Sequence, residues 1–162
     1  MTDGFLVRNA ARADVPALFA MVRELAEYER LTHLCVATEA HLERGLFGPE
    51  VNVEALIATR GAEPAGFALY FHTFSTFLGR KGLYLEDLFV RPPHRNRGCG
   101  RALLTAVARI AAQRGCGRLE WMVLDWNAPA IRFYEEIGAK QMKEWRLFRV
   151  TGEALDEIAN KR

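Results

Sequence analysis

The sequence is poor in the features that mark secreted and metal-binding proteins. Its three cysteines, Cys35, Cys99 and Cys116, are too few and too irregularly spaced for a disulfide framework or a zinc site. We interpret them as free thiols of a reducing compartment. The four histidines lie far apart and show no metal-ligand spacing. No metal site is therefore expected.

Long hydrophobic runs are also missing. No apolar stretch reaches the ~18 residues that a membrane-spanning helix needs, and the first residues lack the apolar core of a signal peptide. We therefore expect no membrane partner and a cytoplasmic location. The charge is nearly balanced, with 22 basic and 20 acidic residues and a formal net charge of +2. Charge therefore gives no reason to expect nucleic acid as a partner.

The chain does have the size and apolar content of one globular domain. It is 162 residues long and 50% of its residues are hydrophobic, which suits a single domain over residues 1–162 with a buried core. No internal repeat, low-complexity tract or linker divides it.

Hydrophobic periodicity predicts a mixed α/β fold. The sheet is expected to be antiparallel in its N-terminal half and parallel around a strand–helix–strand crossover over residues 83–124. Helices are expected on both faces, with Asp14, Thr38 and Asn127 as N-caps. The predicted strands cover residues 5–9, 53–59, 65–73, 83–90, 118–126 and 144–150, with a loop over 74–82. The predicted helices cover residues 15–30, 38–47, a stripe from Leu103 to Ala111 that stops at Gly115, a segment from Asn127 to Gly138, and 153–159.

One segment between a predicted strand and a predicted helix has the composition of an anion site. It reads Arg-Asn-Arg-Gly-Cys-Gly-Arg over residues 95–101. Gly98 and Gly100 let the backbone approach an anion, and a helix N-terminus adds N–H groups and partial positive charge. The segment lacks the Gly-Lys-Ser/Thr of a Walker A loop and the third glycine of a dinucleotide fingerprint. A pyrophosphate ligand and a plain strand–helix turn both remain open at this point.

The pattern Arg-x-x-Gly-x-Gly before an amphipathic helix resembles the acetyl-CoA pyrophosphate loop of the GNAT N-acetyltransferases. Three further segments resemble the spermidine/spermine (diamine) acetyltransferase subfamily, and the resemblance runs from about residue 5 to residue 158. These segments are Glu24–Glu29, Tyr84–Val90, and Asp125–Asn127 with Phe133-Tyr134 and Gly138-Ala139. The resemblance implies the GNAT fold, a homodimer, and acetyl-CoA as the cosubstrate in a direct transfer to a primary amine of a small molecule.

The resemblance also implies which residues hold the cosubstrate. The pantetheine is expected along the backbone of Leu88, Phe89 and Val90, and the pyrophosphate at the glycine loop, where Cys99 serves as a small filler. The full expected set comprises Leu88, Phe89, Val90, Arg95, Asn96, Arg97, Gly98, Cys99, Gly100, Arg101, Asn127, Pro129, Ala130 and Tyr134.

Two residues are expected to be catalytic. Acetyl transfer to an ammonium group requires removal of a proton, which a carboxylate can accept directly or through water. The resemblance places this carboxylate at Glu86, and it matches Tyr134 to the tyrosine that protonates the leaving thiolate. On sequence alone, Tyr134 also fits a core position beside Ile131 and Ile137, and Asn127 also fits a plain helix cap.

The acceptor loop departs from the polyamine enzymes, which carry an acidic residue and a tryptophan before the Tyr-Leu-Glu-Asp strand. Here this stretch reads Phe-Ser-Thr-Phe over residues 74–77, and it resembles the thialysine-acetylating branch. The acceptor is thus expected to be a diamine, a polyamine, or thialysine or a similar amino acid. The residues expected to contact it are Glu27, Tyr28, Glu29, Phe77, Glu86, Asp87, Glu120, Trp121 and Met122. A non-catalytic acyl-CoA-binding module and a protein N-acetyltransferase are the alternatives.

Overall fold

The computed structural model describes residues 4–50 and 52–161. The chain forms two compact units, the first ending at Leu124 and the second beginning at Asp125, and each unit is described by itself.

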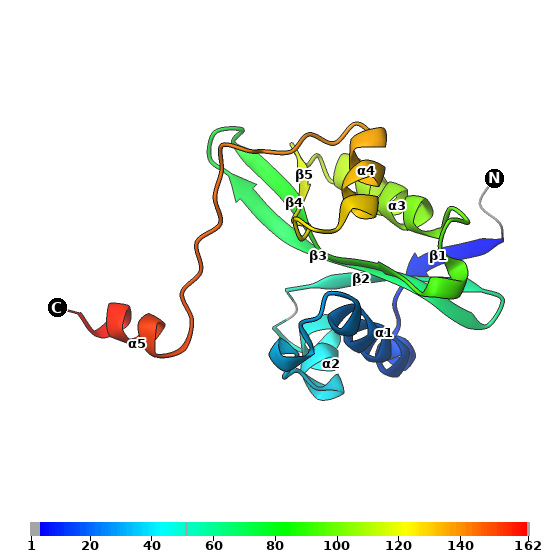
Figure 1. Cartoon of the computed structure of the whole chain (residues 1–162), viewed down its shortest axis with the longest axis horizontal. Helices are drawn as coiled ribbons and strands as arrows, with labels where there is room; N and C mark the ends of the chain where they lie inside the picture. The colour runs from blue at the N-terminus through cyan, green and yellow to red at the C-terminus, as the bar shows by residue number, and fades with distance from the viewer. Residues whose placement is uncertain (1–3, 51, 162) are drawn as a thin grey trace. The chain divides into compact units, whose positions relative to one another are not determined.

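The first unit is built on one mixed sheet of five strands (Figure 1). Their spatial order follows the chain, β1-β2-β3-β4-β5. The first four strands are antiparallel neighbours, and β5 is parallel to β4. The strands span Phe5–Asn9 (β1), Glu54–Arg60 (β2), Glu63–Ser75 (β3), Arg80–Val90 (β4) and Leu119–Trp121 (β5). The expected mixed sheet is confirmed.

Helices cover both faces of this sheet. Figure 1 shows α1 and α2 on one face and α3 on the other. The Thr38 hydroxyl accepts the His41 N–H at 3.3 Å, as expected for an N-cap of α2. Asp14 stands at the expected N-cap position of α1, but its side chain makes no cap hydrogen bond to this helix. The carboxylate instead accepts from Arg8 Nη1 at 2.6 Å and from the Ala11 N–H at 2.7 Å, so it ties β1 to the turn that precedes α1. The three helices span Val15–Tyr28 (α1), Glu39–Phe47 (α2) and Cys99–Gln113 (α3).

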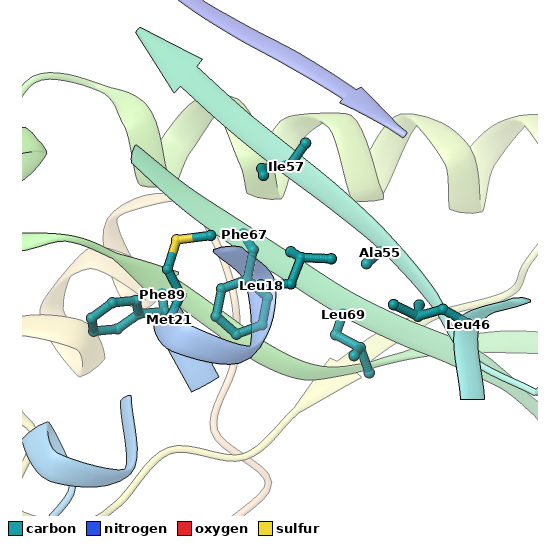
Figure 2. Close-up of a cluster of buried hydrophobic side chains, with 8 residues drawn as sticks. All are labelled: Leu18, Met21, Leu46, Ala55, Ile57, Phe67, Leu69 and Phe89. Atoms are coloured by element: carbon teal, nitrogen blue, oxygen red, sulfur yellow. The ribbon is translucent and has the colours of Figure 1, made fainter. Parts of the chain in front are cut away.

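The core lies on both sides of the sheet. Figure 2 shows the cluster under α1 and α2, where the helices contribute Leu18, Met21 and Leu46 and the strands contribute Ala55, Ile57, Phe67, Leu69 and Phe89. On the opposite face α3 contributes its buried residues Leu103, Leu104, Val107 and Ala111. Because both faces are covered, β2 and the first half of β3 are almost continuously buried.

β4 is interrupted by a β-bulge at Glu86. Leu69 of β3 lies opposite Asp87, and the next β3 residue, Tyr70, lies opposite Leu85, so Glu86 has no register partner on β3. A bulge bends its strand and increases the local twist. The parallel pairing with β5 stops at Leu85. In the described part of the chain, residues 86–90 therefore pair with β3 alone and leave the other edge of β4 open.

The second unit contains two helices, Ala128–Glu136 (α4) and Gly152–Asn160 (α5). Asn127 Oδ1 accepts the Ala130 N–H at 3.4 Å, which confirms the expected N-cap of α4. Gly138, with φ of +91°, follows the end of this helix. None of the helices in the described ranges, in either unit, is long and apolar enough to cross a membrane.

Three boundary predictions are wrong. The strand predicted over 118–126 is only Leu119–Trp121, because its partner β4 bends away after Leu85. The strand predicted over 144–150 does not form, since this segment pairs with no strand among the described residues. The loop predicted over 74–82 shrinks to residues 76–79, because β3 continues to Ser75 and β4 already begins at Arg80. The Gly79 N–H donates to the Ser75 carbonyl at 2.8 Å and closes this turn.

Gly66 lets β3 and β4 approach closely beneath α3. A Cβ at Gly66 would lie 2.5 Å from the Phe89 carbonyl oxygen and 3.3 Å from Leu103 Cδ1. We therefore expect Gly66→Ala to lower the free energy of unfolding by about 1–3 kcal/mol, the usual cost of overpacking. Urea titration followed by circular dichroism measures it.

The matched control is Gly45→Ala. Gly45 lies inside α2, and among the described residues a Cβ there would meet Val53 Cγ2 alone, at an ordinary 3.4 Å. This change should raise the free energy of unfolding by about 0.4–1 kcal/mol, because alanine loses less entropy in a helix. Equal stability of the two variants would contradict the account of Gly66.

Candidate active site

The open edge of β4 presents backbone hydrogen-bonding groups. The Arg91 N–H donates to the Ala65 carbonyl on β3 at 2.9 Å. Because successive residues of a strand direct their backbone groups to opposite sides, the N–H and C=O of Val90 point away from β3, and those of Leu88 do the same. Phe89 turns its backbone toward β3 and buries its side chain in the core. Leu88 and Val90 therefore fit the expected strand-like binding of an extended amide chain.

The glycine loop that follows leads directly into α3. Asn96 and Gly98 both have positive φ, 58° and 84°, and Gly98 is the N-cap of α3. A helix has no internal acceptors for the N–H groups of its first turn. Such N–H groups, together with the helix dipole, are suited to hold an anion, and here they lie at the end of the open β4 edge.

Cys99 is the loop residue that we expect to serve as a small filler. Its side chain is buried, and burial raises the pKa of the thiol to about 11. A thiol with such a pKa is almost entirely protonated at neutral pH and is a poor nucleophile. Gly100 faces β4, where a Cβ would lie 3.6 Å from Val90 Cγ2.

Three expected acceptor residues interact as a group of carboxylates at the bulge. Asp87 is half-buried and its pKa is raised to about 7, first by burial and then by the negative charges of Glu86 and Glu29. Burial also raises the pKa of Glu29, which follows the last residue of α1. Glu86 is exposed. A half-buried acid surrounded by other carboxylates favours a cationic group, since a cation would stabilise its ionised form.

The side chain of Arg95 is directed toward α1. Its guanidinium lies over the Tyr28 ring, with Cζ 4.8 Å from the ring centroid, and over the Phe89 ring at 5.6 Å. Its Nε–H donates to the Val90 carbonyl at 2.8 Å. Arg97, also expected to bind the cosubstrate, is exposed.

The remaining expected residues of the first unit lie outside this group of carboxylates. Glu27 lines a small depression of about 40 Å³ between α1 and the turn Thr32–Leu34. Phe77 lies in the β3–β4 turn with 98% of its surface exposed. Glu120 on β5 is paired with Arg118 at 3.2 Å, Trp121 lies opposite Leu85, and Met122 follows β5.

Four expected residues belong to the second unit. Asn127 caps α4, and Pro129 and Ala130 are in the first turn of this helix. Tyr134 lies further along α4, where its ring contacts Phe133 with centroids 5.4 Å apart. In the described ranges, no group of three or more His, Cys, Asp or Glu side chains could hold a metal ion.

The sequence analysis missed a salt bridge that ties α1 to the end of β4. Arg91 donates through Nη2 to Glu24 at 2.7 Å and through Nη1 to the Pro64 carbonyl at 3.1 Å. These partners are far apart in the chain, so only the long-range fold could reveal the contact. The one signal available was a charged pair of residues, Glu24 and Arg91, beside otherwise apolar segments.

A strand with an open edge that runs into a glycine-capped helix, beside a group of carboxylates, is the arrangement that the sequence leads us to expect of an acyltransferase. The Acetyltransferase (GNAT) family matches residues 19–139. The chain is therefore a member of the GNAT family and is an acyltransferase enzyme, as its sequence predicts.

Individual relatives agree with this assignment. L-ornithine N5-acetyltransferase NATA1 of Arabidopsis thaliana is 37% identical, over 94% of this chain and 86% of that protein. Thialysine N-epsilon-acetyltransferase of Sus scrofa is 36% identical, over 96% of this chain and 98% of that protein. Among solved structures, the integron cassette protein VCH_CASS6 from the mobile metagenome of V. cholerae has a TM-score of 0.82 and 27% identity, covering 98% of this chain and 99% of that one.

The raised pKa of Asp87 predicts a pH dependence of stability. Between its ordinary pKa of 3.8 and about 7, folded Asp87 retains a proton that the unfolded chain has lost. The folded state is therefore destabilised as the pH rises through this window. Asp87→Asn removes this cost. Between pH 5 and pH 8, we expect the decrease in the free energy of unfolding to be at least about 1 kcal/mol smaller for this variant than for the unaltered chain.

Thermal melts at both pH values measure this difference, which corresponds to about 2–4 °C per kcal/mol in a chain of this size. Glu39→Gln, at an exposed carboxylate of α2 that does not contribute to the raised pKa of Asp87, serves as the matched control. Parallel pH profiles of Asp87→Asn and the unaltered chain would contradict the prediction.

Proposed function

We propose that this protein is an acetyl-CoA-dependent N-acetyltransferase that acts on a primary amine of a small amino acid of the thialysine, lysine or ornithine type. The observation that carries the proposal is the open edge of β4 that leads into the Gly98-capped start of α3. It offers an extended amide chain a strand to pair with, and a pyrophosphate a helix N-terminus. The family membership and the names of the most similar curated relatives support the same reaction.

In this proposal the carboxylates at the bulge handle the amine. Asp87 and Glu29 attract the incoming ammonium group, and its positive charge lowers the raised pKa of Asp87. Glu86, which the bulge leaves exposed, accepts the proton from the ammonium directly or through water. The neutral amine then attacks the thioester carbonyl and the carbon–sulfur bond breaks. The Tyr134 hydroxyl gives its proton to the leaving thiolate, and the second proton, which the nitrogen loses as it becomes an amide, returns through water to the tyrosine oxygen.

The preference for an amino acid over a polyamine rests on the β3–β4 turn. This turn, residues 76–79, and the end of β3 before it carry no carboxylate to hold a second, distant ammonium group. Ser75 uses its hydroxyl within the turn, where it accepts the Leu78 N–H at 3.2 Å. The relatives at 35–37% identity that are named for an acceptor are named for ornithine or thialysine.

We also propose that the protein acts as a homodimer. Large apolar side chains are exposed in each unit, Phe74, Phe77 and Leu78 around the β3–β4 turn and Trp145, Leu147 and Phe148 in the extended segment of the second unit. Exposed apolar groups of this size are typical of protein–protein contacts. Sedimentation equilibrium tests the proposal against the chain mass of 18.3 kDa.

A panel of amines tests the proposed reaction. Thialysine, ornithine, lysine, spermidine and spermine are each supplied with acetyl-CoA, and the release of free thiol is followed. We expect kcat/KM for thialysine or ornithine to exceed that for spermidine by at least about tenfold, or ~1.4 kcal/mol of transition-state binding. A clear preference for spermidine would refute the amino-acid acceptor. Tight acetyl-CoA binding in calorimetry without turnover of any amine would instead favour a non-catalytic binding module.

Tyr134→Phe tests the proposed general acid. The change removes one hydroxyl and little volume, so acetyl-CoA affinity should stay within about twofold while kcat falls by roughly 10²–10⁴-fold, the scale of a positioned proton donor. Phe133→Leu, at the neighbouring position of α4, controls for a general disturbance of this helix. Full turnover by Tyr134→Phe would leave Tyr134 with a packing role.

A further inference from the structure

We propose that Arg95 is a positioning residue, and that it acts on acetyl-CoA by fixing the open edge of β4 and the start of the glycine loop against α1, without binding the pyrophosphate. This inference rests on the proposed function. It reassigns the first arginine of the Arg-x-x-Gly-x-Gly pattern, which the sequence suggests as a direct ligand.

The first observation is that Arg95 already makes three contacts within the protein. Its guanidinium carbon lies 4.8 Å from the centroid of the Tyr28 ring and 5.6 Å from that of the Phe89 ring, both within the ~6 Å range of a cation–π contact. Its Nε–H is used by the Val90 carbonyl at 2.8 Å. The side chain is half-buried in this arrangement. Aromatic rings and a backbone carbonyl together fix its position and orientation.

The second observation is that a nearby arginine, Arg91, also contacts α1. Arg91, four residues earlier, makes a two-pronged salt bridge to Glu24, through Nη2 at 2.7 Å and through Nε at 3.0 Å. Glu24 and Tyr28 are also four residues apart, so they lie on one face of α1. The two arginines flank the short turn Pro92–His94. Helix α1 therefore holds both ends of the turn from which the glycine loop starts.

The contact with Val90 decides what the open edge can offer. The Val90 carbonyl points to this edge, and one of its two lone pairs already accepts from Arg95. The groups at this edge that best suit an extended amide chain are therefore the Val90 N–H and the backbone of Leu88. Arg95 thus sets the direction of the edge and limits its hydrogen-bonding pattern. Directly after Arg95, the chain turns through Asn96 at φ 58° toward Gly98.

In this proposal, groups other than Arg95 bind the pyrophosphate. The first-turn N–H groups of α3 lie at the end of the loop. The exposed Arg97 supplies positive charge there. Arg95 and Arg97 should consequently affect different parts of acetyl-CoA: Arg95 the pantetheine along β4, and Arg97 the phosphates.

Two acyl donors separate these roles. Acetyl-CoA has both the pantetheine and the pyrophosphate, whereas S-acetylpantetheine has the pantetheine alone. We expect Arg95→Met to weaken acetyl-CoA binding in calorimetry by at least about tenfold and to lower kcat/KM with S-acetylpantetheine by a similar factor. Arg97→Met should lower kcat/KM with acetyl-CoA and leave the value with S-acetylpantetheine unchanged.

Tyr28 provides the second, independent variant. Tyr28→Leu removes the stacked ring, and it should reproduce most of the loss of acetyl-CoA affinity, whereas Tyr28→Phe keeps the ring and should keep the affinity. The double variant Tyr28→Leu/Arg95→Met should bind acetyl-CoA no more weakly than Arg95→Met, because both changes break one contact. Arg95→Lys should not restore affinity, since an ammonium cannot stack as a plane while donating to the Val90 carbonyl.

The outcomes are distinct. A loss in Arg95→Met that appears with acetyl-CoA and vanishes with S-acetylpantetheine would overturn the inference and make Arg95 a phosphate ligand. Unchanged acetyl-CoA affinity in Tyr28→Leu would also overturn it, and this test remains available if Arg95→Met does not fold. Failure of the unaltered chain to bind acetyl-CoA would overturn the proposed function, and this inference with it.

Discussion

The divergence of β4 from β5 is the constraint on which the site depends. A sheet satisfies its backbone groups by pairing every strand, yet the extra residue at Glu86 bends β4 so that β5 follows it only as far as Leu85. The unpaired edge is maintained because β3 and the buried cores on both faces hold β4 in place. The same bulge brings Glu86 and Asp87 to the inner end of the open edge, so one irregularity creates both the binding edge and the adjacent charges.

Two kinds of force hold this irregular region in place. The core packs apolar side chains of α1, α2 and the strands, and the stabilisation that it provides does not depend on the orientation of individual groups. The contacts at the end of β4 are directional, through the guanidinium groups of Arg91 and Arg95 and their partners on α1. Apolar packing therefore fixes where the sheet lies, and the arginine contacts fix how the loop leaves it.

The sequence predicted the regular parts of the molecule and missed the irregular ones. Strands β1 to β4 and helices α1 to α3 follow from periodicity, and the glycine loop follows from its place between a strand and a helix. The bulge could not be predicted, because the adjacent carboxylates Glu86 and Asp87 within an apolar strand do not reveal that the register with β3 shifts there. The short β5 is a consequence of that bulge. The salt bridge between Glu24 and Arg91 joins residues that only the fold brings together. The segment 144–150 has a strand-like pattern, but periodicity cannot supply the neighbour that a strand needs.

The buried thiol of Cys99 has a consequence for the chemical durability of the loop. With a pKa of about 11, only about one molecule in 10⁴ carries a thiolate at neutral pH, and oxidants and electrophiles attack the thiolate. The cysteine is the first residue of α3, and only 1% of its surface is exposed. Peroxide would therefore modify exposed, acidic thiols of other proteins long before it modified Cys99 in this loop.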